Sequence, residues 1–190
     1  MSPSRNASMG QPAYDSNGLW IALIVAGGAV LSTCFACVTP FAALATLAAL
    51  RLPARERWAV IGFVWLANQA AGFALLGYPL TWDCVAWGLA IGLSASAAVL
   101  AASAFATARP APLAISLPFV AALAAFEAGL YAAGRVLPTG ADAFSVSVIQ
   151  HVFWINAVSF CAIMALHQAL SLVARLSSPK ASQPFAAILH

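Results

Sequence analysis

Long apolar stretches separated by short polar breaks dominate the pattern of this chain. A membrane-crossing helix needs roughly 20 mostly apolar residues, because the hydrocarbon core of a bilayer is about 30 Å thick. Five stretches meet this requirement, and they run over about Leu19–Leu50, Trp58–Tyr78, Val85–Thr107, Leu113–Gly134 and Phe144–Arg175. Proline, glycine or arginine marks the breaks, where helical hydrogen bonding has to stop. The pattern predicts an all-α, polytopic transmembrane helical bundle with five spans.

The first stretch is too long for one upright crossing, and Pro40 divides it. The piece after the proline, Phe41–Leu50, is too short to span a membrane alone, but it could return as a re-entrant or strongly tilted helix. In that alternative the chain has six elements and the N-terminus changes sides, whereas all later segments keep theirs. Five crossings are the preferred prediction.

Composition excludes a soluble domain and gives the bundle an orientation. Hydrophobic residues make up 63% of the chain and charged residues 7%, against about 25% charged in soluble domains. If the sides alternate, six of the eight cations share one side, namely Arg51, Arg55, Arg57, Arg109, Arg175 and Lys180. The positive-inside rule places that side and the C-terminus in the cytoplasm. With five crossings the N-terminus, and Trp20 near it, would be outside.

The chain divides into a membrane domain and two polar ends. Residues 1–18 form a polar segment that we expect to be disordered, 19–176 the transmembrane domain, and 177–190 a cytoplasmic tail. The net charge of +3 comes with no basic stripe or binding module, so no nucleic acid partner is expected. A high alanine content resembles that of proteins from GC-rich bacteria, which points to a bacterial inner membrane.

Glu127 is the one acidic residue within a span, and a carboxylate at membrane depth needs a partner or a wet cavity. Glu127 and His151 both lie about eight residues from the same predicted surface, which is roughly 12 Å deep. Because their helices are consecutive and antiparallel, a Glu127–His151 contact is predicted. The carboxyl group could be protonated, paired with His151, or facing a ligand cation.

Other polar and aromatic residues fall at similar depth on the second, fourth and fifth stretches. They are Trp65, Asn68, Gln69, Tyr131, Trp154 and Asn156. Aromatic walls with a few orienting polar groups are typical of a small-molecule pocket. We therefore predict a ligand-binding pocket between these three stretches, built by this set together with Glu127 and His151. The alternative for Asn68, Gln69 and Asn156 is interhelical hydrogen bonding.

Two further features bear on metals and partners. Cys34 and Cys37 form a C-x-x-C pair, which is a weak candidate for thiol redox chemistry or a soft metal ion. Small residues recur every four positions, as in Gly88, Gly92 and Ser96, and such faces permit close helix packing or docking of a partner subunit. No nucleotide-binding or hydrolase motif is present, and no cofactor is expected.

These observations leave three functional hypotheses. The first is a membrane protein that binds or transports a small solute, the second an accessory subunit of a membrane complex, and the third a thiol-redox or metal-handling protein. In length, hydropathy and its possible six elements, the chain resembles the substrate-binding membrane subunits of energy-coupling-factor vitamin transporters, a likeness of size and class. That resemblance implies a solute pocket within the bundle and a partner membrane subunit.

Overall fold

The computed structural model describes residues 16–34, 39–106, 111–138 and 144–177, and these parts are helical, with no strand among them. The elements are α1 (Ser16–Cys34), α2 (Phe41–Arg51), α3 (Ala54–Ala70), the π-helical turn η1 (Ala71–Leu75), α4 (Trp82–Phe105), α5 (Ala111–Gly134) and α6 (Val146–Ser177). Four helices in these parts are long and apolar enough to cross a membrane: Ala54–Leu75, Trp82–Phe105, Ala114–Gly134 and Val146–Val173. This confirms the predicted all-α bundle of membrane type.

The first apolar stretch is broken, so the six-element alternative, rather than five crossings, describes the fold. Helix α1 ends at Cys34 and α2 begins at Phe41, immediately after Pro40. Proline is tolerated at a helix start, where its missing N–H would have had no intrahelical partner, and the Pro40 carbonyl accepts from Leu44 N–H at 3.1 Å. The 11 residues of α2 extend only about 16 Å, too short to cross a bilayer.

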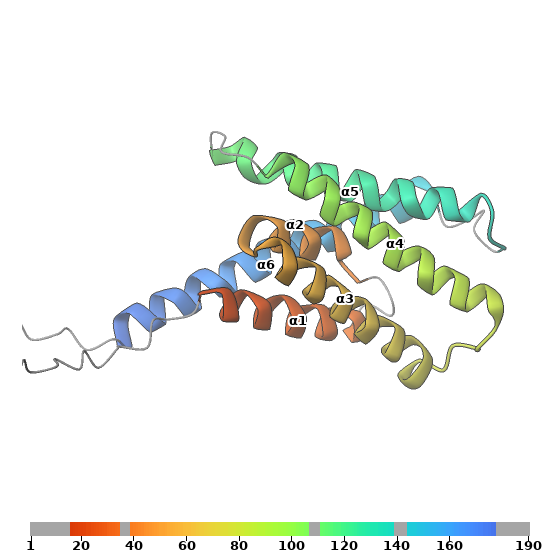
Figure 1. Ribbon diagram of the computed structural model, residues 1–190, viewed down its shortest axis with the longest axis horizontal. Helices are drawn as coiled ribbons and strands as arrows, with labels where there is room; N and C mark the ends of the chain where they lie inside the picture. Colours follow the sequence, from red (N-terminus) through yellow and green to blue (C-terminus); the bar gives the residue numbers. More distant parts are fainter. Residues whose placement is uncertain (1–15, 35–38, 107–110, 139–143, 178–190) are drawn as a thin grey trace, which may run out of the picture.

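Helix α2 forms the centre of the bundle. Every residue from Phe41 to Ala49 is buried, and α2 packs against α1, α3, α4, α5 and α6 (Figure 1). Its small side chains explain how one helix can contact five others, because alanine allows backbones to approach closely. At its N-terminal end the ring of Phe41 lies 5.8 Å from that of Phe126 on α5.

The surrounding helices pack through small residues that are used within the chain. Helices α4 and α5 lie side by side (Figure 1), and a Cβ atom at Gly129 would lie 3.2 Å from Ser94 Cα. On the other face of α4, Gly88 and Gly92 receive the side chains of Gln69 and Trp65 from α3. The glycines of the predicted small-residue face therefore serve internal packing, and docking of a partner subunit stays a prediction.

The arginine-rich end of the bundle, which we call the basic end, also holds the start of α1. The Arg51 guanidinium lies 5.1 Å from the Trp20 ring centre, and Trp20 stacks on His167 of α6 at 3.8 Å. Arg57 donates to Ser103 Oγ at 2.6 Å and joins the start of α3 to the end of α4. Trp20 therefore lies at the opposite end from the one expected with five crossings. The reason is that α1 and α2 run in opposite directions, so the first apolar stretch does not cross the bundle as one helix. The opposite end of the bundle is called the far end.

Candidate functional site

Two asparagines hold the start of α2 inside the bundle. Asn156 Oδ1 of α6 accepts from Ala43 N–H at 3.0 Å, which satisfies one of the donors that a helix start leaves without an intrahelical partner. Asn156 Nδ2 donates to the Val152 carbonyl at 2.9 Å. Thr39 Oγ1 donates to Asn68 Oδ1 of α3 at 2.6 Å. Both asparagines are buried, so a polar helix end is fixed in the apolar interior by side chains from two other helices.

A cavity of about 210 Å³ lies beside this helix start, and we call it the carboxylate cavity. Side chains from α2, α4, α5 and α6 contribute to its wall, which is mostly apolar and aromatic. The lining residues are Thr39, Phe41, Trp87, Ile91, Phe126, Glu127, Leu130, Phe144, Val148 and Val152. Val148, in the first turn of α6, is 40% exposed, so this part of the lining lies near the surface of the bundle at the far end.

Glu127 supplies the one charged group among the described residues that line this cavity. Its Oε1 atom is buried and has no hydrogen-bond partner in the described parts of the chain. An unpaired buried carboxylate oxygen is costly, because burial removes the water that would otherwise solvate it. The side chain that carries this oxygen lines the cavity, so the carboxyl group lies at the boundary between the packed interior and the cavity.

A second cavity of about 240 Å³, the amide cavity, lies between α3 and α4. It shares Trp87 and Ile91 with the carboxylate cavity, and the Thr39–Asn68 hydrogen bond connects the two linings. Its other lining residues are Gln69, Gly72, Phe73, Tyr78, Asp83, Cys84 and Gly88. The π-helical turn η1 forms part of this wall, and π-helical turns are frequent at functional sites.

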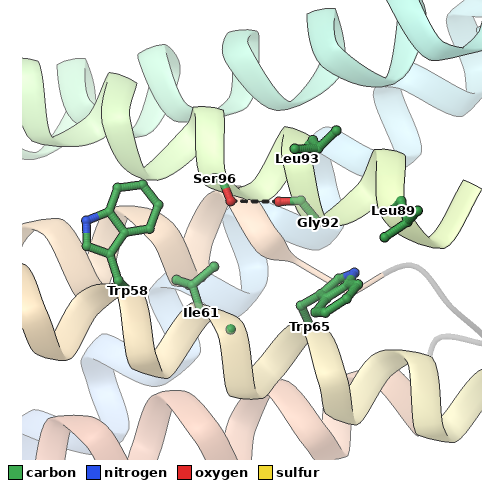
Figure 2. Close-up of a pocket in the computed structure, with 8 residues that line it drawn as sticks. Trp58, Ile61, Trp65, Leu89, Gly92, Leu93 and Ser96 are labelled. Carbon is green, nitrogen blue, oxygen red and sulfur yellow. Dashed lines mark hydrogen bonds between the residues drawn. The ribbon is translucent and has the colours of Figure 1, made fainter. Parts of the chain in front are cut away.

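A third cavity is an open groove of about 220 Å³ on the outer surface of α3 and α4, which we call the outer groove. Figure 2 shows Trp58, Ile61 and Trp65 on the α3 side, and Leu89, Gly92, Leu93 and Ser96 on the α4 side. The Ser96 hydroxyl is occupied, since it donates to the Gly92 carbonyl at 2.9 Å. Leu93 is 73% exposed, and the wall carries no charged group among its described residues, so this groove faces the lipid region.

The structure does not bring the predicted Glu127–His151 pair together. His151 is exposed on α6, whereas Val148 and Val152 of the same helix line the carboxylate cavity. No hydrogen bond or ion pair joins Glu127 and His151 in the described residues. The rotation of α6 turns Val148 and Val152 toward the cavity and leaves the imidazole of His151 exposed.

The other predicted site residues separate into three environments. Asn68 and Asn156 hold α2, as their hydrogen-bonding alternative proposed, and Gln69 lines the amide cavity. Trp65 lies between α3 and α4, where its Nε1 donates to the Gly88 carbonyl at 2.8 Å. Tyr131 and Trp154 are exposed, and their rings pack against Phe144 and Phe153. Helix α2 separates the stretches that were expected to share one pocket.

Several residues of the carboxylate cavity were not predicted from the sequence, among them Thr39, Trp87, Phe126 and Phe144. Two signals could have found some of them: Thr39 precedes the break at Pro40, and Phe126 is adjacent to Glu127. Cys37 and the side chain of Cys34 lie outside the described parts, and so do residues 1–15 and 178–190 of the predicted polar ends. Elsewhere in the described residues no group of three or more His, Cys, Asp or Glu could hold a metal ion.

Comparisons with protein-family models, curated proteins and solved structures found no match for this chain. Fold and composition therefore define the class, an integral membrane protein with an all-α helical bundle. Its distinguishing feature is a short helix that starts within the bundle beside a cavity with a buried carboxylate oxygen.

Proposed function

We propose that this protein binds a compact solute within the membrane, in the carboxylate cavity and the adjoining amide cavity. The observation that carries the proposal is the Glu127 side chain, which lines this cavity beside the start of α2 and whose buried Oε1 has no hydrogen-bond partner among the described residues. Ionisable residues at membrane depth generally mark substrate or ion sites, because lipid packing alone gives no reason to retain them.

The broken first stretch supports the same location. In many transporters, interrupted helices place their ends near the bilayer midplane, and solute sites form there. Here the interruption leaves α2 as a buried half-helix whose start contributes Thr39 and Phe41 to the cavity. Irregular backbone at membrane depth is tolerated where it is buried in protein or lines a cavity; Thr39 and Pro40 are buried, and Thr39 lines the cavity.

The proposed role is a solute-binding subunit of a transporter. We place the entry of the solute beside Val148 at the far end, away from Arg51 and Arg57. The positive-inside rule would make the basic end cytoplasmic and the far end external. Because the sequence has no nucleotide-binding motif, the energy for uptake would come from a partner subunit or an ion gradient.

Filling the cavity tests the proposal. Val152 lines the carboxylate cavity, whereas Val158 of the same helix is 61% exposed. We expect Val152→Phe to abolish binding of solutes that raise the melting temperature of the purified protein in nanodiscs, because the added ring occupies their space. Val158→Phe adds the same ring at the lipid surface and should leave binding unchanged.

A panel of neutral, anionic and cationic compounds of about ten heavy atoms provides the ligands for this thermal-shift assay. If no compound shifts the melting temperature of the unmodified protein, the proposal fails. It also fails if Val152→Phe and Val158→Phe bind alike, because the cavity would then not be the site.

An accessory subunit is the second candidate, and the hydrogen bonds of Asn68 and Asn156 favour it, because both amides serve packing. A partner helix would then lie in the outer groove. At Gly62, which lines this groove, a Cβ atom would meet nothing within 4 Å. Gly62→Phe would fill the groove and should displace a co-purifying membrane subunit without changing solute binding.

A further inference from the structure

We infer that the carboxylate cavity takes a compact organic cation, with one amine or quaternary ammonium charge on a largely apolar body. This inference rests on the proposed function and names the class of solute for the same site. Three features of the cavity lead to it: the sign of its charge, the aromatic wall, and the small number of oxygen ligands.

The first feature is a single uncompensated negative group. Glu127 lines the cavity, and no arginine, lysine or histidine is found among the described residues of its wall. Arg57 and Arg51 lie away from the cavity at the basic end, where Arg57 donates to Ser103 and Arg51 lies over Trp20. Arg135, just after α5, and His151 on α6 are exposed and lie outside the cavity lining. A ligand cation would therefore supply the missing partner, whereas an anion would meet the carboxylate as a like charge.

The start of α2 does not reverse this preference. Helix N-termini attract anions through free N–H groups. Here Ala43 N–H already donates to Asn156 Oδ1, and Phe41 N–H donates to the Thr39 carbonyl at 2.8 Å. Two donors at this helix start are thus engaged within the protein, which leaves fewer free N–H groups for an anion.

The second feature is the aromatic wall. Phe41, Trp87, Phe126 and Phe144 line the cavity together with Glu127. They come from α2, α4, α5 and the residues just before α6, so the rings surround the space rather than cover one side of it. Aromatic faces attract cations through their quadrupole, and sites that combine several rings suit quaternary ammonium groups.

The third feature separates an organic cation from a metal ion. Inorganic cations such as Ca²⁺ take six or more oxygen ligands. Among the described residues of this wall, only the Glu127 carboxylate and the Thr39 hydroxyl offer side-chain oxygens, and Thr39 already donates to Asn68. The remaining surface is hydrocarbon and indole, which suits the apolar body of an organic cation.

The experiment compares three probes of similar size but different charge: benzyltrimethylammonium, benzyl alcohol and benzoate. Binding to the full chain in nanodiscs is measured by thermal shift and by isothermal titration. We expect saturable binding of benzyltrimethylammonium, with affinity at least about tenfold above that of benzoate. Glu127→Gln should weaken cation binding at least about tenfold, in line with a charge-assisted contact, and should leave benzyl alcohol binding within about twofold.

Glu56→Gln is the matched control, because Glu56 is an acid on α3 near the basic end and outside the cavity lining. It should leave all three affinities unchanged. If Glu127→Gln does not fold, the inference is still tested by comparing the affinities of the unmodified protein for the cationic, neutral and anionic probes. Benzoate or benzyl alcohol binding as tightly as the cation would overturn the inference, and so would a folded Glu127→Gln variant with undiminished cation affinity.

The outcome also separates this inference from the proposed function. If a neutral or anionic probe binds and Val152→Phe abolishes that binding, the solute site stands and only the cationic class is wrong. If none of the probes or panel compounds binds, the proposed function fails together with the inference.

Discussion

Two asparagine side chains hold the start of the short central helix α2. Asn156 accepts from the backbone of α2, and Asn68 accepts from the hydroxyl of Thr39, two residues before α2 begins. In an apolar interior the alternative to each contact is an unsatisfied polar group, which costs more than the net gain of an ordinary hydrogen bond. These residues therefore support the cavity by fixing its α2 wall.

Replacing Asn156 tests this role at the residue scale. Asn156→Leu keeps the side-chain size but leaves Ala43 N–H without an acceptor, so we expect a loss of about 1–3 kcal/mol in unfolding free energy. The measurement is reversible unfolding of the protein in mixed micelles. Gln168→Leu removes an exposed amide from the same helix and should change stability by less than about 0.5 kcal/mol. Equal stability of both variants would contradict the role given to Asn156.

At the scale of elements, α2 organises the bundle because it is buried on all sides. Helices that face lipid can be apolar everywhere, but a central helix must also be thin enough for five neighbours to approach it. Most of the buried residues in α2 are alanine or leucine, and it ends with Arg51 at the basic end. Its position creates the carboxylate cavity, since α4, α5 and α6 all meet its first turn.

The close approach of α4 and α5 gives a prediction at the same scale. A Cβ at Gly129 would lie 3.2 Å from the backbone Cα of Ser94, which cannot rotate away. We expect Gly129→Ala to force the two helices apart and to cost about 1–3 kcal/mol of stability. Gly62→Ala is the matched control, because nothing lies within 4 Å of its Cβ; it should be neutral or stabilise by up to about 1 kcal/mol. Denaturant or thermal unfolding of both variants distinguishes close packing from a general intolerance of alanine.

At the scale of the whole molecule, the six elements place the first and last described helices together at one end. Trp20 near the start of α1 stacks on His167 of α6, and Arg51 covers the same tryptophan. A five-crossing chain would separate these residues by the thickness of the membrane. The stacking of Trp20 on His167 therefore places the start of α1 at the basic end. The described N-terminal part then lies on the same side of the bundle as Arg51.

Accessibility of single cysteines tests this topology. In a background without the four native cysteines, Asn17→Cys and Arg55→Cys should react with an impermeant maleimide from the same side. Leu80→Cys, in the turn between η1 and α4, should react from the other side. The positive-inside rule makes the side of Arg55 the cytoplasmic one. Labelling of residue 17 together with residue 80 would restore the five-crossing arrangement and contradict the six-element fold.

The sequence by itself determined the class of the protein and the approximate bounds of its long helices. Each of these follows from local composition, because about 20 apolar residues span a bilayer. The sequence also indicated a break at Pro40. It did not determine whether the chain continues across the membrane after this proline or turns back.

Only the tertiary structure decided which residues meet. In a helix of a soluble protein, the polar face shows which side is exposed to water. Lipid and protein interior are both apolar, so the sequence of a membrane helix gives little indication of which face points into the bundle. For that reason His151 and Trp154 could not be recognised as outward-facing, nor Trp87 and Phe144 as partners of Glu127 in one cavity. Packing around α2 set the rotation of each helix, and that rotation determined which side chains line the cavity.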